Sequence, residues 1–362
     1  SAQRSISPMT HDVYERLAAF LDRLPAGFPK TESGVELRIL KRLFTAEEAS
    51  MACHLAMWPE PVETIAGRIQ KPSCELSDML YDMSRKGLIV RSDRAEGPMY
   101  MAAQYVIGIW EYHVNSLDEG LIKDMNEYIP ALFDAMTRIK TQQLRTIPIG
   151  ASLEGQGAVM PYEDARQLIE KQRKILVAPC ICRKEHTMIG KGCGKLKEAC
   201  LVFSSGAYFY EKNGIGRSIS KEEALDILRQ AEEQGLVLQP SNAQRIMNIC
   251  LCCGDCCQVL KAIKRYPKPA EFVHSNYYAA IRSKDCIACE ICLDRCQMDA
   301  IQLKDNVAEI DPDRCIGCGL CVTTCGTQAI DLIRKDEKDC YEPPSDIVET
   351  YMRIAQERGL IE

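Results

Sequence analysis

Apolar positions between residues 34 and 95 recur at helical spacing in three consecutive segments. Each segment follows a residue that favours a helix start, namely Thr45, Pro61 and Ser73. Gly87 is expected to end the third helix, because glycine readily adopts the left-handed conformation found after a helix. The pattern therefore predicts three short helices in this part of the chain.

The next segment, RSDRAEGPMYMAAQYV, predicts two short strands with a turn at Glu96-Gly97. Three helices followed by such a hairpin resemble a winged helix-turn-helix, and the resemblance implies that fold for residues 34–115. The expected recognition helix carries Glu75, Asp78 and Asp82, which would face DNA phosphates poorly. We therefore expect this domain to bind protein, and nucleic acid is disfavoured as a partner.

Residues 116–140 have a helical period that Pro130 is expected to break or kink. We interpret residues 116–150 as a helical linker or a dimer contact, which makes a homodimer one candidate assembly.

The central region, residues 151–275, contains apolar patterns with the period of a helix and others with the period of a strand. PYEDARQLIEKQRK predicts a helix, and ILVAPC predicts a short buried strand. A capping box at Ser220 and Glu223 begins a further helix, which Gly235 ends before the predicted strand LVLQ. The fold class is thus α+β, with a winged-helix-like N-terminal domain, a cysteine-rich centre and a ferredoxin-like C-terminal domain.

These patterns divide the chain into six parts. They are an N-terminal helical arm (1–33), the winged-helix-like domain (34–115), the linker (116–150), the cysteine-rich metal-binding domain (151–275), a two-cluster ferredoxin domain (276–335) and a C-terminal helical tail (336–362).

An internal repeat near the C-terminal end carries the clearest chemistry. Two copies of C-x2-C-x2-C-x3-C begin at Cys286 and Cys315, 29 residues apart. Three thiolates on one tight loop can reach three irons of a cubane, while the fourth ligates the other cluster. Zinc sites rarely show this repeated register, so iron is the favoured metal.

The repeat resembles bacterial-type two-cluster ferredoxins. The resemblance implies two [4Fe-4S] clusters that transfer electrons, with crossed ligand sets. The first set is Cys286, Cys289, Cys292 and Cys325; the second is Cys315, Cys318, Cys321 and Cys296. Gln297 and Gly326 stand where the family usually has proline, a departure that leaves all eight ligands in place.

Nine further cysteines lie between residues 180 and 257. They are Cys180, Cys182, Cys193, Cys200, Cys250, Cys252, Cys253, Cys256 and Cys257. Thiolates crowded in this way repel one another unless a cation neutralises them, which indicates bound metal. We expect one or two additional [4Fe-4S] clusters, one drawing on the first four cysteines and the other on the last five.

Neighbouring residues on a strand face opposite sides, so Cys252 and Cys253 are expected to serve different clusters. Three alternatives stay open for the central cysteines: zinc with His186 nearby, a thiol–disulfide centre, and a catalytic cluster. The sequence Cys252-Cys253-Gly254 is similar to the CCG motif of heterodisulfide reductase subunits but lacks its long spacers. The region as a whole is similar to cysteine-rich iron–sulfur proteins of strict anaerobes.

Composition restricts the function classes. With 45 basic and 51 acidic residues among 362, the net charge of −6 gives no overall footprint for nucleic acid. No apolar run reaches the roughly 20 residues of a membrane helix, so membrane insertion is not expected. The N-terminus lacks the order of a secretory signal, and oxygen-labile clusters favour a reducing cytoplasm. The three remaining cysteines, Cys53, Cys74 and Cys340, are expected to have no ligand role.

The favoured function is a multi-cluster iron–sulfur electron-transfer protein, a subunit or partner of a larger anaerobic oxidoreductase. One alternative is a redox-sensing transcription regulator that uses the winged helix. A second alternative is a reductase with a catalytic cluster in the central domain; no catalytic residue is identified.

Overall fold

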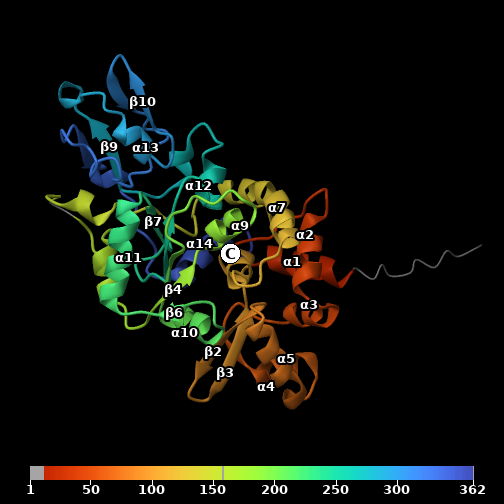
Figure 1. The fold of residues 1–362 in the computed structure, drawn as a ribbon. Coiled ribbons are helices and arrows are strands. Elements are labelled where there is room, and N and C mark those ends of the chain that lie inside the picture. The colour runs from red at the N-terminus through yellow and green to blue at the C-terminus, as the bar shows by residue number, and fades with distance from the viewer. Residues whose placement is uncertain (1–11, 157–158, 362) are drawn as a thin grey trace, which may run out of the picture.

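The computed structural model describes residues 12–156 and 159–361. The first part of the expected N-terminal arm, residues 1–11, lies outside the described residues. A helical N-terminal unit and a ferredoxin-like module lie at different ends of the molecule, with a five-stranded sheet between them (Figure 1). The mixed helix-and-sheet class is confirmed.

The N-terminal unit contains five helices and a small sheet among the described residues. The helices are α1 (Val13–Asp22), α2 (Val35–Leu43), α3 (Ala46–Ala52), α4 (Val62–Ile69) and α5 (Ser73–Arg85). The strands β1 (Glu60–Pro61), β2 (Ile89–Arg94) and β3 (Gly97–Ala102) form an antiparallel sheet in the order β1-β3-β2.

The sequence signals explain where these elements begin and end. Thr45 and Glu48 form a reciprocal capping box at α3, and Pro61 is the N-cap of α4. Helix α5 begins one residue earlier than a cap at Ser73 would imply, because Pro72 holds the N-cap position. Gly87 adopts a φ of +80° after α5 and so turns the chain into β2.

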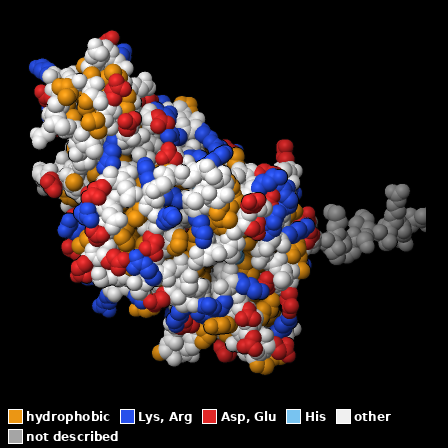
Figure 2. Space-filling model, viewed as in Figure 1, with side chains coloured by type: hydrophobic (Ala, Val, Ile, Leu, Met, Phe, Trp, Pro, Cys, Tyr) orange, Lys and Arg blue, Asp and Glu red, His pale blue; other side chains and the backbone are white. Residues whose placement is uncertain are grey.

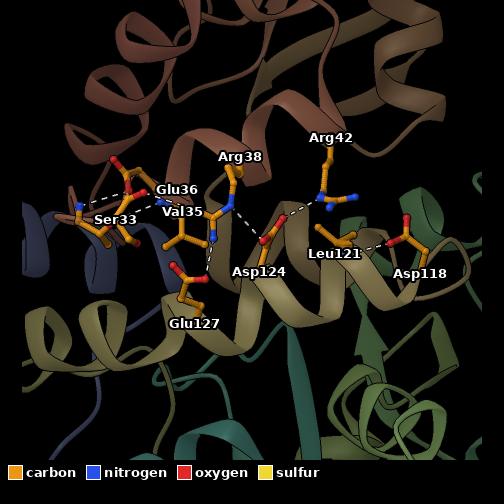
Figure 3. A network of polar contacts seen from close by, with 10 residues as sticks. Ser33, Val35, Glu36, Arg38, Arg42, Asp118, Leu121, Asp124 and Glu127 are labelled. Carbon is orange, nitrogen blue, oxygen red and sulfur yellow. Dashed lines mark hydrogen bonds and ion pairs between the residues drawn. The ribbon is translucent and has the colours of Figure 1, made fainter.

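The short helix α6 (Trp110–Tyr112) leads to α7 (Glu119–Thr137), one helix that continues through Pro130. Its apolar face, including Leu121 and Tyr128, is buried inside the chain. Its polar face is hydrogen-bonded to α2. The buried carboxylate of Asp124 accepts hydrogen bonds from Arg38 at 3.2 Å and Arg42 at 2.7 Å (Figure 3). Helix α7 is therefore part of the N-terminal core.

The central region is an antiparallel sheet flanked by helices. Its strands are β4 (Ile175–Pro179), β5 (Glu198–Phe203), β6 (Arg217–Ser218), β7 (Val237–Pro240) and β8 (Asn248–Cys252), in the order β6-β4-β5-β8-β7. Its helices are α8 (Ala165–Glu170), α9 (Ile181–Met188), α10 (Ser204–Lys212), α11 (Lys221–Glu233) and α12 (Gln258–Ile263).

The expected strands ILVAPC and LVLQ coincide with β4 and β7, which are almost fully buried. Helix α11 begins as expected after Ser220, whose side chain accepts the Glu223 amide. Gly235 follows it with a φ of +71°. Helix α8 is shorter than expected and starts after Asp164, which caps it.

The ferredoxin-like module pairs β9 (Tyr277–Ile281) with β12 (Ile330–Arg334), and β10 (Ile301–Lys304) with β11 (Val307–Ile310). Helix α13 (Ile291–Arg295) lies within the first cysteine motif. The chain then returns to the centre as α14 (Ile347–Glu357), where Arg358 donates to the carbonyl of Leu24 at 2.6 Å. The C-terminal tail thus packs against the other end of the chain.

Candidate iron–sulfur centres

Two pockets in the ferredoxin-like module are each lined by four cysteines. The first, of about 370 Å³, is lined by Cys286, Cys289, Cys292 and Cys325. The second, of about 380 Å³, is lined by Cys296, Cys315, Cys318 and Cys321. In each pocket three thiols come from one motif and the fourth from the other, which is the crossover that the repeat implies.

Backbone amides donate to the pocket sulfurs with the symmetry of the repeat. The amide of Ala300 donates to Cys296 at 3.2 Å, and that of Ala329, 29 residues on, donates to Cys325 at 3.2 Å. The amides of Ala308 and Ala279 similarly contact Cys286 and Cys315 at 3.4 and 3.5 Å. Such N–H···S bonds favour a thiolate and tune the potential of a bound cluster.

Burial makes the second pocket unsuitable for free thiolates. It raises the pKa of Cys318 to about 12, and it also raises the pKa of Cys321. Both thiols would stay protonated at neutral pH unless a cation compensated the charge. A bound iron–sulfur cluster supplies that compensation, so the residues fit the group.

Gln297 connects the module to the central region. Its buried side-chain carbonyl accepts the amide of Gly254 at 2.7 Å. A Cβ at Gly254 would lie 2.3 Å from the backbone oxygen of Gln297, so only glycine fits this approach. The residue that replaces the usual proline therefore binds the central cysteine loop beside the second pocket.

Six of the nine central thiols form a ring. Side-chain interactions connect them in one series, Cys180–Cys182–Cys257–Cys252–Cys250–Cys200. Cys180, at one end of the series, also interacts electrostatically with Cys200 and Cys250 at the other end. We call this set the six-thiol ring.

Strand register explains why the ring members meet. Cys200 on β5 lies directly opposite Cys250 on β8, and Cys252 follows two residues later on the same face. Cys180 directly follows β4 and is the N-cap of α9, while Cys257 is the N-cap of α12. The ring therefore lies where sheet and helices meet.

The other three thiols form a second set, which we call the three-thiol group: Cys193, Cys253 and Cys256. Their sulfurs all lie within 4.8 Å of one another, with 3.7 Å between Cys193 and Cys253. The adjacent residues Cys252 and Cys253 serve different sets, as strand alternation predicts. Each set combines cysteines from the early and the late segment, whereas the sequence predicts one cluster for each segment.

Three residues near the thiols had no signal that we recognised in the sequence. Buried Arg183 interacts electrostatically with Cys180, Cys252 and Cys253 and donates to the carbonyl of Leu196 at 2.7 Å. Its guanidinium supplies positive charge between the two sets. Glu111 on α6 interacts with Cys180 and Cys250, and Tyr210 on α10 interacts with Cys200.

His186 is not free to bind a metal. Its Nδ1 lies 2.8 Å from the carbonyl oxygen of Cys182, and its Nε2 lies 2.7 Å from the Nζ of Lys261. Both ring nitrogens are therefore engaged within the protein. This geometry removes the histidine that made zinc with His186 an alternative.

The three remaining cysteines lie outside both central sets. Cys53 and Cys340 bond the carbonyl oxygens of Ala49 and Lys335, at 3.2 and 3.5 Å. Cys74 is exposed on α5.

Comparison with known proteins agrees with the description of the C-terminal module as ferredoxin-like. Residues 285–339 match the model of a family described as a 4Fe-4S dicluster domain. This match supports [4Fe-4S] binding, and two clusters are consistent with it. Neither the curated proteins nor the solved structures gave a match for the chain. Together the pockets and this match define an iron–sulfur protein, with a ferredoxin-like domain that suggests electron transfer.

Proposed function

We propose that this protein passes electrons between redox partners through two ferredoxin clusters and at least one further iron–sulfur cluster in the six-thiol ring. The observation that carries the proposal is the direct contact between the second ferredoxin pocket and the central cysteine loop. Cys296 lines that pocket, and the next residue, Gln297, accepts the amide of Gly254. Clusters in the pocket and the loop would therefore be neighbours.

Electrons would enter or leave at the first ferredoxin pocket. Cys289 is exposed there, and Ile287 and Ile291 on the same rim are 69% and 50% exposed. Hydrophobic side chains gather at this end of the molecule (Figure 2). An apolar rim around an accessible cluster suits brief docking of another redox protein.

The N-terminal unit would bind the larger oxidoreductase. Its element order, α3-β1-α4-α5-β2-β3 with the sheet order β1-β3-β2, supports the winged-helix interpretation. Glu75, Asp78 and Asp82 are all exposed on α5, so this surface would repel DNA and suits a basic protein surface. We favour protein recognition over the regulator alternative for this reason.

A homodimer through residues 116–150 has less support, because the apolar face of α7 is buried within the chain. The basic stretch after the cysteine loop is also partly used internally: Lys264 pairs with Asp299, and Lys268 pairs with Asp313. No helix among the described residues is long and apolar enough to cross a membrane. We propose a reducing cytoplasm, as in anaerobes, because cubane clusters are assembled under such conditions.

Iron and sulfide analysis of anaerobically purified protein tests the electron-transfer proposal. The ferredoxin clusters alone require about eight Fe per chain, and a third cluster raises this to about twelve. The six thiols of the ring exceed the four that a cubane needs. If the ring holds a larger cluster, with about eight Fe, the total rises to about sixteen Fe per chain. A value near eight, unchanged by Cys250→Ser, would show that the ring holds no iron.

A reductase is a second candidate, favoured by the groups that surround the ring. Glu111 accepts the Gly108 amide at 2.7 Å and interacts with Cys180 and Cys250. Burial raises the pKa of Glu111 to about 8, so its carboxyl would hold a proton beside the ring at neutral pH. The residue is thus positioned to deliver a proton during reduction.

Redox titration at several pH values distinguishes this candidate. If reduction of the ring cluster is coupled to uptake of a proton, its reduction potential falls by ~59 mV for each unit increase in pH. Glu111→Gln would remove this dependence of the potential on pH. Glu63→Gln on α4 is the control, because this glutamate is exposed on another part of the molecule. A potential independent of pH in the unaltered protein argues against a proton-delivering role.

A further inference from the structure

The three-thiol group differs in geometry from the ferredoxin pockets. Each cysteine of a cubane binds a different iron, so its four thiols surround a volume, as they do in the pockets of about 370 and 380 Å³. Cys193, Cys253 and Cys256 instead converge, with every sulfur within 4.8 Å of the others. Among the residues that the structure describes, no other set of Cys, His, Asp or Glu converges in this way.

The spacing matches one tetrahedral ion. A Zn–S bond of about 2.3 Å with tetrahedral angles places the sulfurs about 3.8 Å apart. The observed separation of Cys193 and Cys253 is 3.7 Å. Three thiols at this spacing have room for a single ion between them.

A buried cation lies beside this group. Arg183 contacts Cys253, and its Nε is a buried donor with no partner in the structure. Three thiolates and a divalent ion carry a net charge of −1, which the guanidinium offsets.

We propose that the three-thiol group binds one zinc ion, separate from the iron–sulfur clusters, with a fourth position left to solvent. In the described part of the chain no other Cys, His, Asp or Glu belongs to the convergent set, and Cys193 is partly exposed. Zinc accepts three protein ligands and a water. The site goes beyond the proposed electron transfer, since zinc does not change its oxidation state.

A single ion here would organise the loop of residues 252–257, which contacts both the six-thiol ring and the ferredoxin-like module. Cys253 and Cys256 would bind the ion, while Cys252 and Cys257, adjacent to them in sequence, belong to the six-thiol ring. Gly254 lies between the two ligands and donates to Gln297. The zinc would therefore lie on the loop that connects the ring with the ferredoxin-like module.

Metal analysis of full-length protein, purified anaerobically from medium containing iron and zinc, tests this site. The unaltered protein should contain about one zinc per chain, and Cys193→Ser should lose most of it while keeping its iron. Cys340→Ser, outside both sets, should change neither metal. Cys289→Ser should lower iron and leave zinc unchanged, which separates this result from the electron-transfer proposal.

Zinc-edge X-ray absorption on the unaltered protein gives a readout that does not depend on a variant folding. The expected spectrum has three sulfurs at about 2.3 Å and one nitrogen or oxygen. Absence of zinc, a shell of four sulfurs, or loss of about four Fe in Cys193→Ser would each overturn the proposal. The last result would mean that the group binds a cubane instead.

Discussion

At the scale of single residues, Gln297 shows how one departure from a family pattern acquires a role. Proline is usual at this position in two-cluster ferredoxins, where it stiffens a turn. Here the side chain reaches out of the module and accepts the Gly254 amide at 2.7 Å in a buried contact. Proline has no group that can replace this acceptor.

Gln297→Pro should therefore weaken the attachment of the module while leaving its ligands in place. Loss of the acceptor leaves the Gly254 amide unsatisfied, at a cost of about 1–3 kcal/mol. Thermal unfolding followed by circular dichroism would measure the loss. Gly326→Pro is the matched control, since Gly326 is the equivalent repeat position, is exposed and has no atom near its Cβ position. Equal melting temperatures for both variants would contradict the role of Gln297.

His274 gives a prediction about pH. Its ring stacks on Tyr341 at 3.8 Å, and its Nε2 lies 3.1 Å from the carbonyl oxygen of Lys140. Burial lowers its pKa to about 4. Below the usual histidine pKa of 6.5, the unfolded chain therefore binds more protons at this side chain than the folded protein does. Stability should fall as the pH decreases from 6.5 towards 4.

Urea unfolding between pH 6.5 and 5, where acid damage to clusters is limited, tests this. The slope of stability against pH should be smaller in His274→Phe, which keeps an aromatic ring against Tyr341. Identical slopes in both proteins would assign the pH effect to other groups.

The cysteines show which site residues a sequence can reveal. The eight ferredoxin ligands follow from local spacing, because each motif folds as one tight loop. The nine central thiols could be found but not grouped, since the pairing of β5 with β8 decides that Cys200 faces Cys250. Arg183 and Glu111 gave no signal, because their position near the thiols depends on tertiary packing.

At the scale of elements, helix starts and stops were predictable where a cap or a glycine fixes them. Thr45, Pro61 and Gly87 act as expected. Pro130 is the exception, since α7 continues through it. Packing of the apolar face of α7 against the N-terminal core outweighs the hydrogen bond that proline cannot make.

The contact of α7 with α2 is tested by Asp124→Ala. This carboxylate is 5% exposed and binds both Arg38 and Arg42, so its loss should cost about 1.5–3 kcal/mol (Figure 3). Glu127→Ala is the control, because its pair with Arg38 is exposed and should contribute less than about 1 kcal/mol. Denaturant unfolding would measure both, and a larger effect for Glu127 would be evidence against this account.

At the scale of the whole molecule, α14 joins distant parts of the chain. Glu357 accepts the amide and hydroxyl of Thr141, at 2.8 and 2.6 Å, and Thr350 donates to the carbonyl of Asn242 at 2.5 Å. Arg358 donates to the carbonyl of Leu24 and pairs with Asp22. The helix thus holds the N-terminal unit against the central sheet.

Arg358→Ala should loosen this arrangement. Several hydrogen bonds to the turn after α1 are lost, at a cost of about 1.5–3 kcal/mol, and the N-terminal unit should become more sensitive to protease. Arg353→Ala, which breaks only an exposed pair with Glu349 on the same helix, should leave the digestion rate unchanged. Similar digestion of the two variants would show that Arg358 does not hold the ends together.

The return of α14 also has a consequence for maturation. Tyr351 on this helix interacts with Glu111, which itself lies beside the six-thiol ring. The groups that surround the ring therefore come from segments separated by most of the chain, and they meet only once the last helix has been made. A cluster bound in the ring would therefore acquire its complete surroundings only after α14 has packed in place.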